Sequence, residues 1–549
     1  MPTVLLKVDL AKAFDTVAWP FLLEVLEHAG FPARWREWIS AMLRTASTKV
    51  LINGRPGQRL CHARGLRQGD PLSPFLFVLV MEVLNSLISE ADRRRQLTPL
   101  SGHIIKHRAS IYADDLVIFL APNAVDFSCV AQLLELFAGA SGLATNVDKC
   151  TISPIRCSQE EIDVVLEVFP CKLQAFPSKY LGAPLSLSRL PRSCEQAIVD
   201  RVAARLPTWK AGLLTATGRA TLTQTTLSAI PVHVSICCAL SAWAIQEIDK
   251  RRRGFLWAGA KSTVGGKCKV AWQVVCSPRD LGGLGLPDLR VLGFALRLRW
   301  EWLRRSDPDL PWAPLPARDE RIVQRMFHAS VQFVIGNEAS VRFWTDDWLP
   351  AGPIYCFAPA VFRAVPTRRR ARSVRDAIAD HQWARDASAA STTESIAQFL
   401  TIWHMLSNVH LQPSVQDQLL WKWTANGRYS SASAYRAFFL GRTPFFGAKE
   451  LWAASTPPKA KFFFWLALHG RLWTAEQRRR HGQQPGDDCA LCDQQPETTD
   501  HLLVACVFAR EVWQRLLSAI GLDHLLPSGV SRLVDWWQDS RALLPQQLR

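Results

Sequence analysis

Residues 109–121 read ASIYADDLVIFLA, two apolar runs separated by Ala113-Asp114-Asp115. Apolar residues on both sides of a short polar step predict two antiparallel strands joined by a tight turn. Aspartate is disfavoured inside strands, so two acids at the tip of such a hairpin either make the turn or serve a function. Both interpretations are open at this point.

A third acid follows another apolar strand. Residues 4–8 (VLLKV) predict a buried strand, and Asp9 comes directly after it. If this strand lies beside the hairpin, Asp9 and Asp114 meet at one edge of a sheet. Crowded carboxylates repel unless cations lie between them, and Mg²⁺ prefers oxygen ligands that it shares with phosphates. Two such ions, about 3.5–4 Å apart, hold the attacking and leaving oxygens of a phosphoryl transfer.

The surrounding sequence predicts an α+β fold. Residues 49–60 alternate around Asn53-Gly54, which predicts a second hairpin, and FLFVLVMEVLNSLI at 75–88 predicts a buried helix. Helical spacing covers three further stretches, residues 18–29, 34–44 and 124–140. This order of elements predicts an antiparallel sheet with helices packed against it.

Composition narrows the class of protein. The 549 residues are 48% apolar and 21% charged, which excludes wholesale disorder and suggests three or four domains. Basic residues exceed acidic ones, 65 against 48, so the net charge of +17 indicates a polyanionic partner, a nucleic acid or an anionic membrane surface. No apolar run of membrane-spanning length is present, and the most apolar stretch, Phe75 to Met81, is far too short. The N-terminus is not a secretory signal, so the 14 cysteines are expected as free thiols or metal ligands in an intracellular protein, nuclear, cytoplasmic or both.

Five strings resemble the reverse transcriptase motifs A to E, in the family's order. They are VDLAKAFDTV (8–17), GLRQGDPLSP (65–74), YADD (112–115), GLATNVDKC (142–150) and YLGAPL (180–185). The sequences of these motifs are most similar to those in reverse transcriptases of non-LTR (LINE-type) retrotransposons, especially plant ones. The resemblance implies a polymerase palm that extends a DNA primer or target DNA with dNTPs on an RNA template, using two Mg²⁺ ions and no membrane.

The resemblance assigns roles at the acidic edge. It implies that Asp9 and Asp114 are metal ligands and that Asp115 is an accessory catalytic acid. It also implies that the backbone carbonyl of Leu10 assists in binding the metal. Tyr112 opens the YADD motif and is expected beside the substrate.

Four further residues take roles from the resemblance. Phe14 matches the steric gate that rejects a ribose 2′-OH, although a plain core phenylalanine is the alternative. Gln68 and Gly69 match residues that lie along the template and incoming nucleotide, against the alternative of an ordinary Gly-Asp-Pro turn. Lys149 matches a lysine that protonates the departing pyrophosphate, and a solvated surface lysine is the alternative.

The C-terminal part carries a Cys/His cluster with the spacing C-x2-C-x8-H-x4-C. Its members are Cys489, Cys492, His501 and Cys506. Four soft ligands suit one structural Zn²⁺ with tetrahedral geometry; four free side chains are the alternative. His501 and Cys506 are five residues apart, so the helix must bend or one ligand must lie beyond its end. His469 and His481 are nearby reserve ligands.

The segments KFFFWLALHGRLWT (461–474) and TTDHLLVAC (498–506) resemble the zinc-binding domain that follows the reverse transcriptase in plant non-LTR elements. The predicted domains are a palm at 1–185, a helical and basic thumb or connector at 186–330, a linker region at 331–448, the zinc-binding domain at 449–520 and a tail at 521–549. Within them, 361–395 is expected to be exposed or a linker. Trp and Arg at 297–305 suit either base stacking with phosphate contacts or an amphipathic helix with solvated arginines.

The chain begins at motif A, whereas the family has a fingers region and an endonuclease before it. We therefore expect weak or absent activity from this chain alone. The competing interpretation is an inactive RNA-binding remnant, or a domesticated zinc-knuckle protein. A third interpretation treats residues 450–520 as a zinc-stabilised protein-interaction module.

Overall fold

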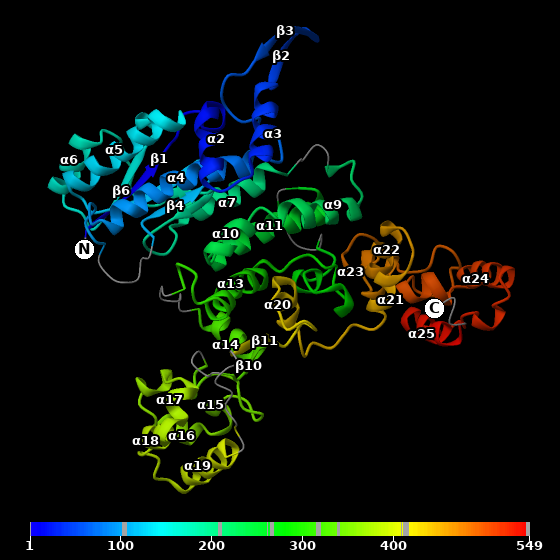
Figure 1. Ribbon diagram of the computed structural model, residues 1–549. Helices are drawn as coiled ribbons and strands as arrows, with labels where there is room; N and C mark the ends of the chain where they lie inside the picture. The colour runs from blue at the N-terminus through cyan, green and yellow to red at the C-terminus, as the bar shows by residue number, and fades with distance from the viewer. Residues whose placement is uncertain are drawn as a thin grey trace. The chain divides into compact units, whose positions relative to one another are not determined.

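The structure is a computed structural model that describes residues 2–100, 107–206, 211–260, 262–263, 268–313, 320–336, 341–407, 409 and 417–544. The chain forms two compact units. The first contains residues 1–189 and 309–316, and the second contains residues 190–308 and 317–549 (Figure 1). Parts of the predicted linker region (337–340, 408 and 410–416) and the end of the predicted tail (545–549) lie outside the described residues.

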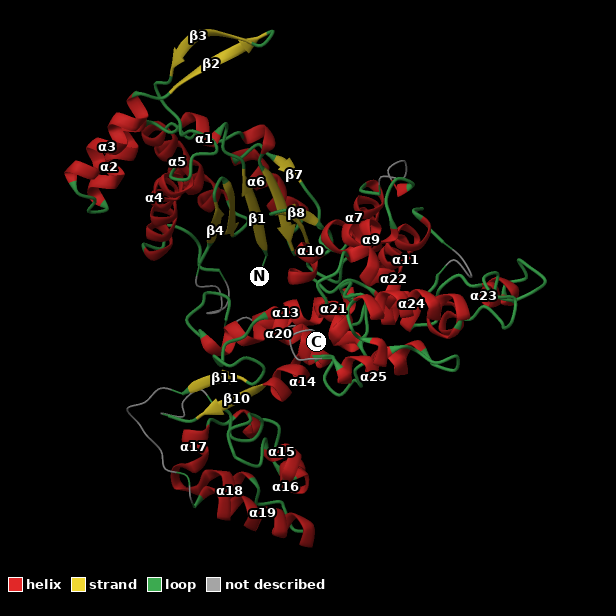
Figure 2. Cartoon of the chain, turned by 90° about the vertical axis from the view of Figure 1, so that its right-hand side faces the viewer, coloured by secondary structure: helices red, strands yellow, loops and turns green. Residues whose placement is uncertain are grey.

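The first unit is built on a five-stranded sheet with the order β4-β5-β1-β6-β7. Its strands are β1 (Thr3–Val8), β4 (Ala109–Tyr112), β5 (Asp115–Leu120), β6 (Thr151–Ile155) and β7 (Lys172–Leu173). The central strand β1 pairs antiparallel with β5 and β6, while β6 and β7 run parallel. Figure 2 shows these strands side by side, with the small hairpin of β8 (Ser178–Tyr180) and β9 (Ala183–Leu185) close to them.

One face of the sheet forms the core of this unit. Val8 pairs with Leu116, and Leu6 pairs with Ile118, so their side chains point to the same face. All four are buried. The face is covered by helices α2 (Trp19–His28), α4 (Ser73–Arg93), α5 (Ala124–Ser141) and α6 (Gln159–Val168).

Helices α4 and α5 are long and apolar enough to cross a membrane by length and composition. Each turns an apolar side toward the sheet: Phe77 and Val80 of α4 and Phe127 and Val130 of α5 belong to the same buried cluster as the strands. Core packing therefore explains their apolar character. The prediction of a buried helix over 75–88 is confirmed.

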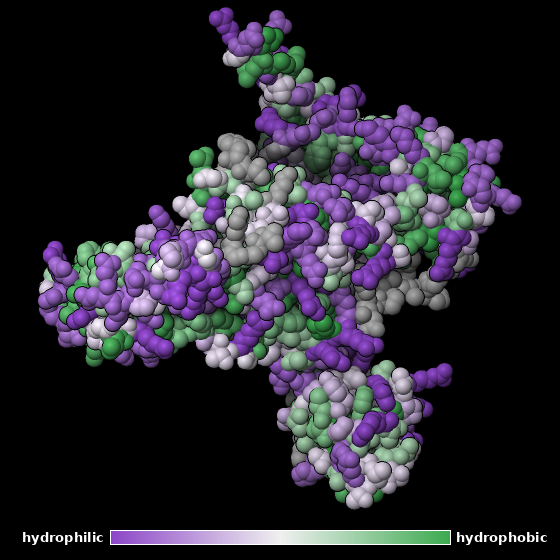
Figure 3. Space-filling model, turned by 180° about the vertical axis from the view of Figure 1, so that it is seen from behind, coloured by the Kyte–Doolittle hydropathy of each residue, from purple (hydrophilic) through white to green (hydrophobic). Residues whose placement is uncertain are grey.

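The predicted hairpin at Asn53-Gly54 is confirmed. Strand β2 (Ser47–Ile52) follows α3 (Ala33–Arg44) and pairs with β3 (Arg55–Cys61), and both turn residues have positive φ. This hairpin is a separate two-stranded sheet rather than part of the main one. Apolar side chains such as Leu51 and Ile52 are exposed on it, and Figure 3 shows hydrophobic and hydrophilic atoms mixed on its surface at the top of the view.

The second unit is mostly helical. Its helices are α7 (Arg192–Ala204), α9 (Ala216–Leu222), α10 (Val232–Cys237), α11 (Ala242–Ala258), α12 (Trp272–Val275), α13 (Leu289–Ser306), α14 (Arg321–Ser330), α15 (Ile354–Phe357), α16 (Pro359–Ala364), α17 (Val374–Ile378), α18 (Gln382–Asp386), α19 (Thr393–Leu406), α20 (Ser431–Ala437), α21 (Ala448–Ala453), α22 (Pro458–Leu468), α23 (Ala475–Arg480), α24 (Val507–Ala519) and α25 (Leu533–Leu543). Strands β10 (Val331–Val334) and β11 (Gln418–Trp421) form its two-stranded sheet. The predicted α+β class is confirmed.

The aromatic and basic residues of α13 have structural partners. Trp302 lies against Trp421 and Tyr429, with ring centroids 6.1 Å from each. Arg297 forms an ion pair with Glu320 at 2.9 Å, and Arg305 forms one with Asp346 at 3.0 Å. These side chains are therefore neither free to stack on bases nor simply solvated.

The prediction of an exposed or linker segment over 361–395 is wrong. Val361, Val374 and Trp383 are at most 1% exposed and belong to the core that contains Trp344. Arginines made the segment look solvated, but Arg372 pairs with the buried Asp386 at 2.7 Å. The segment therefore packs through its apolar side chains and this ion pair, while Arg363, Arg368 and Arg375 remain exposed.

Candidate functional site

The backbone around Asp9 is held by the segment that follows α5. The Asp9 carbonyl oxygen accepts a hydrogen bond from Asn146 N at 2.8 Å, and Asp9 N donates to Cys150 Sγ at 3.4 Å. The buried Leu10 bridges to Thr145 between them. The strings at 8–17 and 142–150, far apart in sequence, therefore lie side by side.

Asp114 and Asp115 lie at the tip of the β4–β5 hairpin. Tyr112 pairs with Asp115 across a two-residue turn, in which Ala113 has φ of 53°. A non-glycine residue in this left-handed region carries a strain of roughly 1–2 kcal/mol, a feature common at functional sites. Because Val8 pairs with Leu116, the same register carries Asp9 toward Asp115. The structure thus brings the three acids to one edge of the sheet.

The three carboxylates differ in their partners. Asp115 forms an ion pair with Lys7, with Nζ and Oδ1 3.3 Å apart. The carboxylates of Asp9 and Asp114 have no hydrogen bond or ion pair with any described residue, and Asp114 is exposed. Two unpaired, hard oxygen ligands at one edge fit a divalent cation such as Mg²⁺.

The glycine-rich loop that precedes α4 is bound to the short helix α1 (Ala13–Thr16) and to Trp19, the first residue of α2. Leu66 N donates to the Phe14 carbonyl at 2.6 Å, and Trp19 Nε1 donates to the Gly65 carbonyl at 2.8 Å. Gly65 has φ of +87°, and a Cβ there would lie 2.5 Å from the carbonyl oxygen of Asp15. Gly65 is therefore required for this close approach.

Sequence reasoning emphasised Gly69 and missed Gly65. Gly69 has the same φ of +87°, but a Cβ there would meet nothing within 4 Å. Gln68 is exposed, and its Nε2 donates to Asp15 Oδ1 at 3.3 Å. No sequence signal distinguished the two glycines, because the contact partner lies 50 residues upstream.

Phe14 and Lys149 have different surroundings. The Phe14 ring is half-buried and stacks on Phe77 of α4, with centroids 4.4 Å apart. Lys149 is exposed at the end of a short helix that begins after Asn146, the residue bonded to Asp9. The ring of Tyr112 is 67% exposed. The substrate roles of these residues stay predictions.

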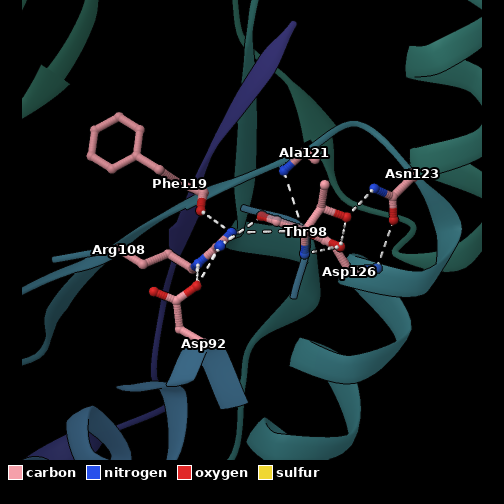
Figure 4. A network of polar contacts seen from close by, with 7 residues as sticks. All are labelled: Asp92, Thr98, Arg108, Phe119, Ala121, Asn123 and Asp126. Carbon is pink, nitrogen blue, oxygen red and sulfur yellow. Dashed lines mark hydrogen bonds and ion pairs between the residues drawn. The ribbon is translucent and has the colours of Figure 1, made fainter. Parts of the chain in front are cut away.

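A buried ion network holds the base of the β4–β5 hairpin (Figure 4). Arg108, at the start of β4, donates to Asp92 of α4 at 2.6 Å and to the Thr98 carbonyl at 2.7 Å. It also donates to the Phe119 carbonyl of β5 at 3.3 Å. Arg108 is 5% exposed, whereas the side chain of its partner Asp92 is 39% exposed, so this ion pair lies at the border between core and solvent.

Asp126 completes this network from the first turn of α5. Its carboxylate is fully buried, lies 3.6 Å from Arg108 Nη1, and accepts hydrogen bonds from Thr98 N at 3.0 Å and Ala121 N at 3.4 Å. Asn123 caps the same helix. The network therefore ties the base of the β4–β5 hairpin to helices α4 and α5, which sequence reasoning did not anticipate.

The four residues of the Cys/His cluster come together in the second unit. The ligand atoms of Cys489, Cys492, His501 and Cys506 all lie within 4.8 Å of one another. Cys489 Sγ and Cys506 Sγ are 4.0 Å apart, far longer than a disulfide bond of about 2.05 Å. With Zn–S bonds of about 2.3 Å, the edge of a tetrahedral site is about 3.8 Å, so the cluster fits Zn²⁺.

The spacing of His501 and Cys506 is explained by a π-helical turn. Residues His501–Ala505 form this turn, and Cys506 N donates to the His501 carbonyl at 2.7 Å. Cys506 itself has φ −59° and ψ 139°, outside helical geometry. The ligand therefore lies just beyond the helix end, one of the two predicted solutions.

The reserve ligands stay outside the cluster. His469 Nε2 lies 3.1 Å from the Gly282 carbonyl, and its ring stacks on Phe445. His481 lies against Trp473. Burial raises the pKa of the Cys489 thiol, whereas backbone hydrogen bonds, first that of Gln494, lower the pKa of Cys492.

Comparison with known families agrees with both sites. Residues 1–185 match the model described as reverse transcriptase (RNA-dependent DNA polymerase), and residues 429–513 match the model described as zinc-binding in reverse transcriptase. The first 185 residues are therefore similar to reverse transcriptases, and residues 429–513 are similar to the zinc-binding domain found with them.

Its relatives include transposon and retrotransposon proteins. A protein of Arabidopsis thaliana named as a ribonuclease H protein is 24% identical over 61% of this chain and 57% of its own length. An uncharacterized protein of the transposon TX1 of Xenopus laevis is 29% identical over 61% of this chain and 25% of its own. The Pol polyprotein of a type-2 retrotransposable element of Drosophila melanogaster is 26% identical over 62% of this chain and 32% of its own length. The resemblance to retrotransposon reverse transcriptases is confirmed, and the chain spans from a quarter to somewhat over half of these relatives.

Proposed function

We propose that the first unit is an RNA-directed DNA polymerase of the non-LTR retrotransposon type. It adds dNTPs to a DNA 3′-OH along an RNA template by two-metal nucleotidyl transfer. The observation that carries the proposal is a pair of carboxylates without partners among the described residues, Asp9 at the end of β1 and Asp114 at the tip of the β4–β5 hairpin.

In this proposal Asp9 and Asp114 hold the Mg²⁺ ions. When bound, these ions supply charge neutralisation for the triphosphate and activation of the 3′-OH. The chain's own contribution is position: the Cys150 and Asn146 contacts fix the backbone of Asp9, and the Arg108 network fixes the hairpin that carries Asp114. Fixed ligands lower the reorganisation needed during the reaction.

The template and incoming nucleotide are expected along the loop at 65–69. This loop is held against α1 and carries Gln68 at its exposed side. We also propose that the Cys/His cluster holds one structural Zn²⁺ and that the net charge of +17 serves contacts with RNA and with the RNA–DNA hybrid.

Primer extension on poly(rA)·oligo(dT) with dTTP and Mg²⁺ tests the polymerase proposal. We expect weak incorporation, which Asp114→Ala lowers at least about a hundredfold because the variant loses a proposed metal ligand. Asp163→Asn, on the exposed side of α6, is the matched control and should retain activity. No incorporation by the parent chain, or incorporation that survives Asp114→Ala, would refute the proposal.

A further inference from the structure

Lys7 lies on the face of the sheet opposite to the core. It pairs with Val117 of β5, and Val117 pairs with Ser110 of β4, so these three side chains form one row across the sheet. The next row toward the hairpin tip contains Asp115, with Asp9 one step past the end of β1. Because residues two apart along a strand point to the same face, Lys7 shares a face with this acidic row.

The ammonium group of Lys7 is bound to one of the three acids. Its Nζ lies 3.3 Å from Asp115 Oδ1. Asp9 and Asp114 have no such partner among the described residues. The positive charge of Lys7 therefore offsets the negative charge of Asp115, whereas Asp9 and Asp114 have no such nearby cation among the described residues.

The same ammonium group contacts the β8–β9 hairpin, which carries YLGAPL (180–185), the string that resembles motif E, the primer-grip region of the family. Lys7 Nζ donates to the Lys179 carbonyl at 3.5 Å. In the same row, Ser110 Oγ and the Tyr180 hydroxyl share a hydrogen bond at 3.1 Å. The β8–β9 hairpin therefore rests on the row that contains Lys7 and Ser110.

We infer that Lys7 is a positioning residue for the proposed polymerase site. It neutralises Asp115, so that Asp9 and Asp114 are the carboxylates left for the metal ions, and it holds the β8–β9 hairpin beside the catalytic hairpin. The inference rests on the proposed function and extends it to a residue that the motif strings do not include.

The exposure of this pair makes it testable. The side chains of Lys7 and Asp115 are 33% and 40% exposed. An ion pair this accessible to water contributes little to folding stability. Substitution of Lys7 should leave a folded chain, so changes in metal binding or turnover report on the site.

The first experiment measures Mn²⁺ binding to the full chain by electron paramagnetic resonance, which needs no polymerase activity. Asp114→Ala identifies the binding that depends on the carboxylate site. We expect Lys7→Met to tighten this binding about threefold to tenfold, because a positive charge is lost and Asp115 is freed. Lys7→Arg should restore the parent affinity. Lys172→Met, on exposed strand β7 of the same sheet, is the control and should change nothing.

The Asp115→Asn background decides whether Lys7 acts through Asp115. In that background Lys7→Met should tighten Mn²⁺ binding clearly less than in the parent chain, because only the loss of the lysine charge remains. An equal effect in both backgrounds, or no effect in either, would overturn the inference. If instead Asp114→Ala leaves Mn²⁺ binding unchanged, the proposed metal site fails, which is a separate result.

Two further readouts separate positioning from a general structural effect. Amide hydrogen exchange over 178–185 should be faster in Lys7→Met than in Lys172→Met, because the β8–β9 hairpin loses one of its contacts. In primer extension, Lys7→Met should raise the KM for primer as well as lower kcat, and Lys7→Arg should recover both. Unchanged exchange over this hairpin together with an unchanged primer KM would contradict the proposed link to the primer grip.

Discussion

Cys506 N–H donates to the carbonyl oxygen of His501 at 2.7 Å and closes a five-residue π-helical turn. The turn brings the side chains of both residues to Cys489 and Cys492, although an α-helix would separate positions five apart. The odd spacing is therefore part of the site rather than evidence against it.

Removal of one ligand should release the metal. We expect Cys506→Ser to lower the zinc content from one ion per chain toward zero, because three ligands do not close a structural site. Metal analysis of purified chain measures this directly. Chelation should lower the unfolding temperature of the parent chain and leave that of the variant unchanged.

Cys356→Ser is the matched control, since Cys356 is an exposed free cysteine outside the cluster. It should bind zinc as the parent does. A parent chain that contains no zinc after purification in zinc-supplemented buffer would show that the cluster assignment is wrong.

Loss of Arg108 should destabilise the first unit. Arg108→Met leaves the fully buried Asp126 without its cationic partner, and breaking a buried pair in this way costs about 3–5 kcal/mol in the free energy of unfolding. Urea unfolding measures the change. Arg44→Met, at an exposed position of α3, should cost less than about 0.5 kcal/mol.

The double variant Arg108→Met with Asp126→Asn distinguishes the cause. If the penalty comes from an uncompensated carboxylate, the second substitution should recover part of the lost stability. Additive losses would show instead that Arg108 acts mainly through Asp92 and the backbone carbonyls.

Local sequence patterns were sufficient for much of the fold. The alternation around Asn53-Gly54 and the apolar runs at 4–8 and 109–121 depend on residues close in the chain, so the strands could be predicted. The convergence of Asp9 with Asp114 followed from one assumption, that the two strands are neighbours, and the register of β1 with β5 confirms that these strands pair.

Relationships between distant segments could not be predicted. Three contacts join different elements of the fold: the Arg108–Asp126 pair, the Lys7–Asp115 pair and the contact of Gly65 with Asp15. Neither the charge nor the composition of the sequence shows which residues form these contacts. The prediction for the segment 361–395 failed for the same reason, because the composition did not show that Arg372 pairs with the buried Asp386.

Acid should destabilise the second unit partly through His469. Burial lowers the pKa of His469 below its ordinary value, so the folded chain binds this proton less readily than the unfolded chain. The stability from the neutral ring is complete above the unfolded pKa of about 6.5 and is lost as the pH falls below it. One such group contributes a slope of at most about 1.4 kcal/mol per pH unit.

Urea unfolding between pH 7.5 and 5 measures this slope. His469→Gln should flatten it, while His481→Gln, at an exposed position beside Trp473, should not. Identical slopes in the parent chain and His469→Gln would assign the pH dependence to other groups.

Gly65→Ala tests whether the close approach of the glycine-rich loop to α1 matters for function. The new Cβ would lie 2.5 Å from the Asp15 carbonyl oxygen, a backbone atom that cannot move without shifting α1. Gly54 and Gly69 have similar positive φ values, but a Cβ at either position would meet open space, so Gly54→Ala and Gly69→Ala are the controls.

All three variants should lose roughly 1–2 kcal/mol of unfolding free energy, because alanine is disfavoured in the left-handed region. Only Gly65→Ala should exceed this loss and displace the backbone next to Phe14. In primer extension, Gly54→Ala should therefore retain activity and Gly65→Ala should lose most of it. If Gly65→Ala is no less stable than Gly69→Ala, the loop accommodates a side chain and the approach to Asp15 is not a requirement of the fold.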